Sequence, residues 1–216
     1  IFDLFPEWGE WPLKFFDKKV VFISSRVHPG ETGASHMFNG FLDMLVNDTH
    51  QSRALLKNYV FKIIPALNPD GIYWGYYRTD TLGQNLNRMY PDPKLNISPT
   101  IKGIKEAIIQ QKSSLFAFID FHAHATKKGI FFFGNCLPDE KQVDNILLAK
   151  LVSLNCINFD MFECNFSDEI MTKVDKKGES WEGSGWVTIF KETGITHCYT
   201  IECNYHNGKR LGRIPY

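Results

Sequence analysis

The sequence lacks the cysteine pattern of a disulfide framework or of a thiolate zinc site. Its 5 cysteines are odd in number, and none of them forms a C-x-x-C pair. Disulfide scaffolds and zinc knuckles both depend on paired cysteines at short, regular spacings. The cysteines are Cys136, Cys156, Cys164, Cys198 and Cys203. We therefore expect free thiols in a reducing, cytoplasmic compartment.

An excess of charge and a long apolar run are also missing. The 24 basic residues balance 24 acidic ones, so no overall field attracts nucleic acid or an acidic membrane surface. No uninterrupted apolar run approaches the roughly 20 residues of a membrane span, and no basic-then-apolar leader opens the chain. Neither nucleic acid nor a membrane is expected as a partner. Because the first residue is Ile1, we interpret the sequence as a soluble piece of a longer protein.

The residues that are present predict one domain with alternating strands and helices. Hydrophobic residues make up 44% of the 216 positions, enough for one substantial core. Apolar runs typical of strands cover 19–25, 59–67, 115–121, 130–134 and 197–203. Helical patterns cover 33–46, a stretch that begins at Ser98 and Pro99, 138–154 and 184–193. This order predicts an α/β fold with a mixed, mainly parallel, twisted sheet and helices on both faces.

The first candidate site is the segment from His28 to Glu31, which follows the first predicted strand. A His and a Glu at this spacing can share one cation, although the pair alone is a weak signal. Pro29 and Gly30 exclude a helix here and favour a turn, which points both side chains out of the strand end. Ligands of α/β folds gather at such strand ends. We interpret the pair as part of a metal site.

A third ligand is expected from the segment Asp120 to His124. Catalytic zinc takes three protein ligands with N or O donors and leaves a further position for water. The segment closes a strongly apolar strand, so it reaches the same sheet edge if the two strands run parallel. His122 and His124 lie on one side of an extended strand, and periodicity does not choose between them. A hydrogen-bonded histidine at a strand end is the alternative for either one.

The series of motifs resembles that of the zinc carboxypeptidase family, and within it the cytosolic carboxypeptidase branch. The matching segments are HPGE at 28–31, NPDG at 68–71, GYYR at 75–78, NLNR at 85–88, DFHAH at 120–124 and YTIE at 199–202. They follow the order of the family. The resemblance implies a zinc carboxypeptidase-like fold that is truncated at both ends. Residues 19–216 would form an incomplete catalytic domain, and residues 1–18 an N-terminal packing segment or linker.

The resemblance implies a metal site and a proton acceptor. His28, Glu31 and His122 would hold one Zn²⁺ per chain, and His122 is chosen because the family's ligand follows an Asp-Phe or Asp-Leu pair. Glu202 would be the general base and later the general acid. Zinc lowers the pKa of bound water towards about 7, and a neighbouring carboxylate can then take its proton. Without the other motifs, Glu202 would be interpreted as a surface residue at a strand end.

The resemblance also implies residues that bind the substrate. Arg78 would polarise the scissile carbonyl, and Asn87 and Arg88 would bind the terminal carboxylate. Guanidinium binds a carboxylate through two parallel hydrogen bonds, which explains an Arg in place of a Lys. Taken alone, Arg78 and Arg88 are equally consistent with solvated loop residues.

The implied activity is hydrolysis of C-terminal or branch-point glutamates from acidic protein tails such as polyglutamylated tubulin, by attack of a zinc-bound water. The partners would be acidic peptide tails in the cytosol, at microtubules or in the nucleus. Two alternatives remain open. One is an aspartoacylase-like zinc deacylase of small amino-acid conjugates, which resembles this fold and also uses H-x-x-E with a distant His. The other is a non-catalytic binder of acidic tubulin tails.

Three positions depart from the family's pattern. Asn85 stands where secreted relatives have an acidic residue that orients a zinc-bound histidine, so support of the metal is expected to differ. Phe190 replaces a tyrosine or tryptophan and would cap the substrate without a hydrogen bond. Trp186 follows the GSG turn where cytosolic relatives often have a basic residue. Three lysines remain as sources of positive charge near the site: Lys127, Lys128 and Lys191.

Overall fold

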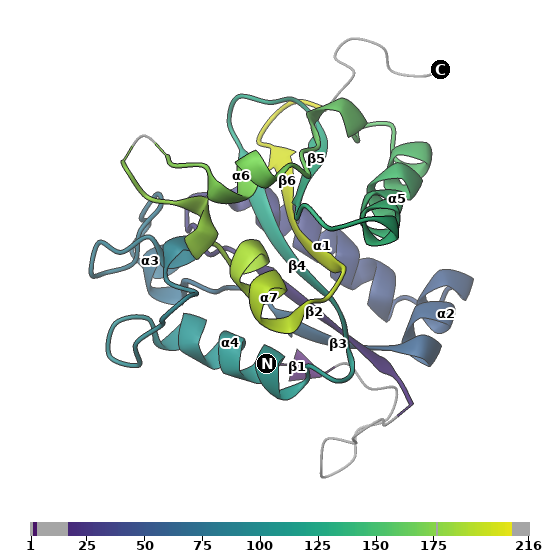
Figure 1. Cartoon of the computed structure of the whole chain (residues 1–216), viewed down its shortest axis with the longest axis horizontal. Helices are drawn as coiled ribbons and strands as arrows, with labels where there is room; N and C mark the ends of the chain where they lie inside the picture. Colours follow the sequence, from purple (N-terminus) through teal and green to yellow (C-terminus); the bar gives the residue numbers. More distant parts are fainter. Residues whose placement is uncertain (1, 4–16, 176, 209–216) are drawn as a thin grey trace.

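The computed structural model describes residues 2–3, 17–175 and 177–208. Within these ranges a six-stranded sheet has the order β1-β3-β2-β4-β6-β5 (Figure 1). The strands are β1 (Phe2–Asp3), β2 (Lys19–Ser25), β3 (Tyr59–Ile64), β4 (Leu115–His124), β5 (Ile130–Gly134) and β6 (His197–Asn204). The four central strands are parallel, and the two edge strands pair antiparallel to their neighbours. The expected mixed, mainly parallel sheet is confirmed.

Helices cover both faces of this sheet, as predicted (Figure 1). On one face lie α1 (Thr32–Val46), α2 (His50–Asn58) and α5 (Glu140–Asn155). On the other lie α4 (Pro99–Gln110) and α7 (Gly185–Thr193). The short helices are α3 (Pro69–Tyr73) and α6 (Asp168–Thr172), with 3₁₀ turns η1 (Leu86–Arg88), η2 (Met161–Glu163) and η3 (Trp181–Gly183).

The central strand β2 shows why the sheet is buried on both sides. Val21 and Ile23 pack into the cluster under α1, and Val20 and Phe22 into the cluster under α4 and α7. Successive side chains of a strand point to opposite faces, so a strand covered on both faces is apolar without alternation. Polar groups lie only at the two ends of β2, with the exposed Lys19 at its start and Ser24 and Ser25 at its carboxyl end.

Two strands have bounds that differ from the predicted ones by three residues, and the strand predicted for 197–203 continues by one residue to Asn204. The strand predicted for 59–67 ends at Ile64, because Pro65 has no backbone N–H for the ladder. The strand predicted for 115–121 continues to His124, so His122 and His124 both belong to β4. The bounds of the predicted helices differ by one or two residues.

Helix α2 was missing from the predicted elements. It begins with a capping box in which the Ser52 amide donates to Thr49 Oγ1 at 3.1 Å and the Thr49 amide donates to Ser52 Oγ at 2.9 Å. Capping boxes satisfy free amides at a helix start. Its apolar contribution to the core comes from Leu55 and Leu56 alone, and such a short apolar stripe gives little periodic signal.

The division at residue 18 stays a prediction, because residues 1 and 4–16 lie outside the described ranges. Phe2–Asp3 pair antiparallel with Lys62 and Ile63 of β3. In the described part of the chain, no helix combines the length and apolar character needed to span a bilayer.

Candidate metal centre and substrate cavity

The parallel strands bring the predicted ligands together at their carboxyl ends, which we call the carboxyl edge of the sheet. Ser24 of β2 lies beside Asp120 of β4 in the ladder, so both strands reach the same edge at their carboxyl ends. His28 follows β2, and His122 pairs with Glu202 of β6 across the ladder. A topology of parallel strands thus brings together groups that are far apart in the sequence.

The turn that carries His28 and Glu31 is held from two sides. Arg26 has a positive φ of 58°, an uncommon backbone conformation for a residue with a side chain. Its guanidinium donates from Nε to the Pro29 carbonyl at 3.0 Å and from Nη1 to Ser35 Oγ at 2.6 Å. On the other side the Gly30 amide donates to the Tyr77 carbonyl at 2.8 Å. A Cβ at Gly30 would lie 2.7 Å from that oxygen, so glycine permits the HPGE and GYYR segments to meet.

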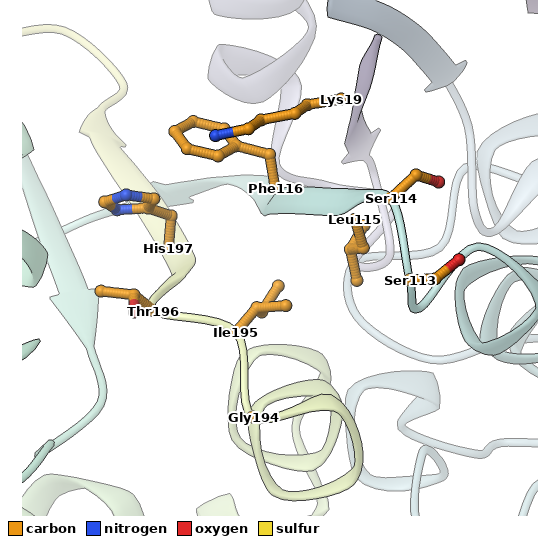
Figure 2. Close-up of a pocket in the computed structure, with 9 residues that line it drawn as sticks. All are labelled: Lys19, Ser113, Ser114, Leu115, Phe116, Gly194, Ile195, Thr196 and His197. Atoms are coloured by element: carbon orange, nitrogen blue, oxygen red, sulfur yellow. The ribbon is translucent and has the colours of Figure 1, made fainter. Parts of the chain in front are cut away.

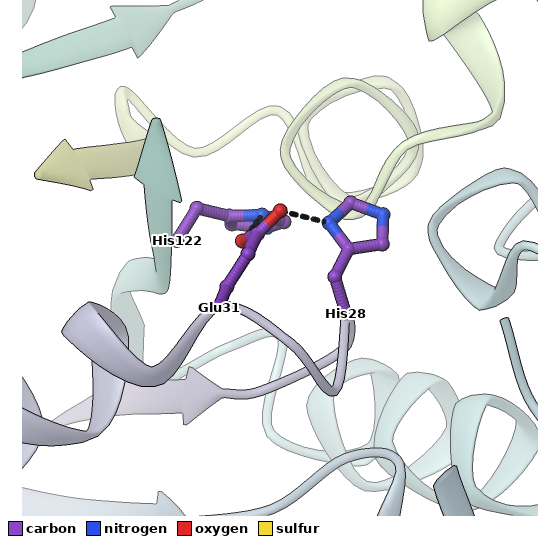
Figure 3. A group of neighbouring side chains, drawn as sticks. All are labelled: His28, Glu31 and His122. Carbon is purple, nitrogen blue, oxygen red and sulfur yellow. Dashed lines mark hydrogen bonds and ion pairs between the residues drawn. The ribbon is translucent and has the colours of Figure 1, made fainter. Parts of the chain in front are cut away.

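His28, Glu31 and His122 form one compact cluster (Figure 3). Their ligand atoms all lie within 4.8 Å of one another. Glu31 lies between the two rings: Oε1 is 2.7 Å from His28 Nδ1, and Oε2 is 3.0 Å from His122 Nδ1. Both histidines are only 3% exposed. The structure brings His122 into the cluster, whereas His124 Nδ1 accepts hydrogen bonds from the Thr126 and Lys127 amides.

The electrostatics of the cluster favour a positive charge, because the effect of burial is outweighed by Asp120 and Glu31, which raise the pKa of His122. Burial alone would raise the pKa of Glu31, but His28 and His122 outweigh it and hold that pKa well below its usual range. Burial lowers the pKa of His28 and so favours the neutral ring, which is the form that coordinates metals. Two imidazole nitrogens and one carboxylate form the donor set of a catalytic zinc site that keeps a position for water. The residues present therefore fit zinc.

Each histidine is held through its second ring nitrogen. His122 Nε2 lies 2.7 Å from Asp120 Oδ2, and Ser24 Oγ donates to Asp120 Oδ1 at 2.7 Å. His28 Nε2 lies 3.1 Å from Asn85 Oδ1. Such contacts orient metal ligands. Asp120 was not predicted to have a role, although its position two residues before His122 on the same strand face was a usable signal.

All seven predicted site residues line one cavity of about 280 Å³. They are His28, Glu31, Arg78, Asn87, Arg88, His122 and Glu202. The buried Oε2 of Glu202 has no hydrogen-bond partner among the described residues. Burial raises the pKa of Glu202 to about 8, against the opposing effect of His122. The cavity thus combines the ligand cluster with a buried carboxyl group whose pKa is close to neutrality.

The predicted substrate-binding residues line the cavity from segments outside the sheet. Arg88 donates from Nη1 to the Asn87 carbonyl at 2.9 Å and from Nη2 to Asp175 Oδ2 at 3.2 Å. Asn87 Oδ1 accepts from the Gly185 amide at 3.1 Å, which ties the NLNR segment to the start of α7. Arg78 is 34% exposed, and its Nη1 lies 4.0 Å from Glu31 Oε1. Both arginines line the cavity that contains the cluster, and Arg78 is the one in reach of Glu31.

The departures at Trp186 and Phe190 have different outcomes. Trp186 is buried and lines the cavity. Phe190 packs against the core beneath α7 and is absent from the cavity wall, so the expected cap over the substrate is wrong for the described residues. Lys127 and Lys191 are already paired, with Glu163 at 2.9 Å and Glu182 at 2.6 Å.

A second cavity of about 300 Å³ lies at the amino ends of the parallel strands, the amino edge of the sheet (Figure 2). It is lined by the residues that begin β2, β4 and β6 and by the turns before them: Lys19, Ser113, Ser114, Leu115, Phe116, Gly194, Ile195, Thr196 and His197. None of these residues belongs to a predicted motif.

Comparison with known proteins relates the chain to metallopeptidases. A family model described as zinc carboxypeptidase matches residues 15–135. Cytosolic carboxypeptidase-like protein 5 of Rattus norvegicus is 35% identical over 98% of this chain and 36% of that protein. Cytosolic carboxypeptidase 6 of Mus musculus is 36% identical over 93% of this chain and 37% of that protein. The predicted resemblance to the cytosolic carboxypeptidase branch is confirmed, and the chain spans about a third of the length of these relatives.

Solved structures give the same result for the fold. A metallo-carboxypeptidase from Burkholderia cenocepacia has a TM-score of 0.72 at 25% identity and is matched over 91% of this chain and 50% of that one. A metallo-carboxypeptidase from Pseudomonas aeruginosa has a TM-score of 0.69 at 19% identity, over 88% of this chain and 50% of that one. At the latter identity the likeness concerns the fold alone.

Proposed function

The chain belongs to the zinc carboxypeptidase family, and we propose that it forms the catalytic part of a metallocarboxypeptidase that releases glutamates from acidic protein tails. The observation that carries this proposal is the composition of a single cavity. It joins the cluster of His28, Glu31 and His122 to the buried carboxyl of Glu202 and to the guanidinium of Arg88. Hydrolysis of the last peptide bond of a chain requires metal ligands, a proton acceptor and a group that binds the terminal carboxylate of the substrate.

His28, Glu31 and His122 would hold the zinc. When bound there, zinc polarises a carbonyl and makes water a better nucleophile near neutral pH. Glu202 lies across the ladder from His122, and its Oε2 has no hydrogen-bond partner among the described residues. It would take the proton of the attacking water and deliver it to the leaving amine. A carboxyl with a pKa close to the working pH serves in both directions.

Arg88 and Asn87 would fix the end of the peptide. Of the Arg88 guanidinium nitrogens, Nε is buried without a partner among the described residues, while Nη1 and Nη2 have one each. Charge-assisted, paired hydrogen bonds to a carboxylate give both energy and orientation. Arg78, which lies nearer to the cluster, would polarise the scissile carbonyl and stabilise the developing negative charge.

The substrate class in this proposal is an acidic tail, with glutamylated tubulin as the specific candidate partner in the cytosol. Its support is the similarity to proteins named cytosolic carboxypeptidases and the positive charge around the cavity. Arg78 and Arg88 line the cavity, and Lys173 Nζ lies 5.4 Å from the ring of Trp181 in its wall. Negative charge on the tail and positive charge at the site favour encounter.

The test combines zinc content with glutamate release from an acidic peptide. We expect about one zinc per chain and release in the wild-type protein, and loss of both in His122→Ala. His124→Ala is the matched control, because it removes an imidazole two residues along the same strand and outside the cluster. It should keep its zinc.

Three other outcomes would contradict parts of the proposal. Hydrolysis of small N-acyl amino acids without release from peptides would assign a deacylase. Absence of zinc in the wild-type protein would favour a non-catalytic binder of acidic tails. Zinc and glutamate release that both survive in His122→Ala would remove His122 from the metal site.

A further inference from the structure

A carboxylate far along the chain contacts the residue that supports His28. Asn85 Nδ2 donates to Glu179 Oε2 at 2.9 Å, across 94 positions of the sequence. The other end of the same amide, Asn85 Oδ1, lies 3.1 Å from His28 Nε2. A continuous path of two hydrogen bonds therefore connects Glu179 to the metal-ligand cluster.

The direction of this path follows from donor and acceptor types. An ionised carboxylate only accepts hydrogen bonds, whereas an Asn amide has a donating end and an accepting end. Glu179 therefore accepts a hydrogen bond from the NH₂ group of Asn85, and Oδ1 of the same amide faces His28. An acceptor at this place requires the proton of the imidazole to sit on Nε2. The lone pair of His28 is then on Nδ1, which is the nitrogen that faces Glu31 and the cluster.

Without Glu179 the Asn85 amide could present either end to the ring. The reversed amide would donate to Nε2, place the imidazole proton on Nδ1 and so block the nitrogen that faces the cluster. The carboxylate also places a negative charge behind a neutral amide. Groups behind a metal-bound histidine fix its tautomer and raise its strength as a ligand.

Glu179 is held in place by the turn that carries it. The Glu179 amide donates to Asp175 Oδ1 at 3.1 Å, and the Asp175 amide donates to the Glu179 carbonyl at 3.0 Å. Asp175 Oδ2 accepts from Arg88 Nη2 at 3.2 Å. The turn is thus attached both to the substrate wall of the cavity and to the support of the metal cluster.

We propose that Glu179 is a positioning residue, which acts through Asn85 to set the tautomer of His28 and to strengthen its binding of a divalent metal. The part on metal affinity rests on the proposed function, because it takes zinc as the occupant of the cluster. The part on the tautomer does not depend on zinc.

The first experiment measures zinc affinity by chelator competition in Glu179→Ala, in Glu179→Ala combined with Asn85→Asp, and in the wild-type protein. Glu179→Ala should weaken zinc binding at least about tenfold. The carboxylate that Asn85→Asp introduces accepts directly from His28 Nε2, so the double variant should regain an affinity within about threefold of the wild type. If Glu179→Ala weakened zinc binding only by destabilising the fold, Asn85→Asp would not restore the affinity. Glu182→Ala is the control, because Glu182 is paired with Lys191 outside the cavity.

The second experiment determines the tautomer of His28 in metal-free protein by long-range ¹H–¹⁵N correlation. The wild-type ring should carry its proton on Nε2, and Glu179→Ala should show a mixture of tautomers. An unchanged tautomer, zinc affinity within twofold of the wild type, or failure of Asn85→Asp to rescue would each overturn the assignment. If the wild-type protein binds no zinc, the proposed function fails, and the tautomer still tests Glu179 separately.

Discussion

The two edges of the sheet offer cavities of similar volume, about 280 Å³ at the carboxyl ends of the strands and about 300 Å³ at their amino ends. The same strands β2, β4 and β6 supply residues near both. At the carboxyl edge, His28 and His122 are buried and converge on a carboxylate. At the amino edge, His197 Nδ1 lies 2.9 Å from the hydroxyl of Tyr199, a core residue. Cavity size therefore does not distinguish the two edges, whereas the buried polar groups do.

The carboxyl edge buries several ionisable groups, which is unfavourable for folding, and the residues that line the amino-edge cavity include no buried ionisable group. Burying ionisable groups is unfavourable unless they are paired, and Glu31, Asp120 and both histidines pair with one another. Glu202 is the exception, since its Oε2 is buried without a partner among the described residues. An unpaired buried carboxyl weakens the fold, so its position beside the metal ligands is consistent with a catalytic use.

Glu202→Gln is expected to have the largest effect at the carboxyl edge. It removes the proton acceptor and leaves the three ligands intact, so kcat for glutamate release should fall by about 10²–10⁴-fold while zinc content stays the same. The measurement is steady-state release together with metal analysis. Glu106→Gln is the control, because Glu106 is an exposed partner of Lys102 on α4. Loss of zinc in Glu202→Gln would show that Glu202 has a structural role in the metal site.

Glu202 also affects the stability of the metal-free protein. Burial raises the pKa of Glu202 from 4.5 to about 8, so between these values the folded state retains a proton that the unfolded state has released. Stability from this group is therefore present below pH 4.5 and is lost as pH rises through 8, by about 1.4 kcal/mol per pH unit at most. Urea unfolding after chelation should show Glu202→Gln gaining stability relative to the wild type as pH increases. A difference that is independent of pH would show that Glu202 is not protonated in the fold.

Arg88→Lys is expected to have a smaller effect, confined to substrate binding. Lysine keeps the charge but loses the paired geometry of guanidinium, and loss of a charged hydrogen bond costs about 1.5–3 kcal/mol. KM should rise at least about tenfold with little change in kcat. Arg53→Lys is the control, since Arg53 is 54% exposed and paired with Asp48. A fall in kcat without a change in KM would place Arg88 in the chemical step.

The sequence was sufficient for the part of the site that depends on strand ends. HPGE and YTIE each follow or close an apolar run, so parallel pairing brings His28, Glu31 and Glu202 to one edge. The role of Glu202 and the choice between His122 and His124 needed the family resemblance, because a lone Glu at a strand end is interpreted as a surface residue and both histidines share one strand face. The structure separates them, since His122 belongs to the ligand cluster while His124 Nδ1 accepts from the Thr126 and Lys127 amides.

The parts that the sequence did not predict depend on contacts between irregular segments. Glu179 and Asp175 lie in a turn without periodic hydrophobicity, and their partners Asn85 and Arg88 lie far away in the sequence. No local pattern encodes such a contact. Helix α2 was missed for a related reason, because a short helix with few apolar contacts is specified by its cap and not by a core stripe.

Two lysines that each lie over an aromatic ring provide the finest comparison of the two edges, although Lys127 also pairs with Glu163 at 2.9 Å. Lys127 Nζ lies 4.9 Å from the ring of Phe131 near the substrate cavity, and Lys19 Nζ lies 5.0 Å from the ring of Phe116 at the amino edge. Each cation–π contact contributes about 0.5–1 kcal/mol at an exposed site, and the exposed Lys127–Glu163 pair adds at most about 1 kcal/mol, so both alanine variants should lose only small amounts of unfolding free energy. Activity should separate them. Lys127→Ala removes positive charge near the entry of an acidic tail and should raise KM by about two- to fivefold, whereas Lys19→Ala should leave it unchanged. Equal KM values in the two variants would mean that the acidic tail is recognised inside the cavity and not by charge around it.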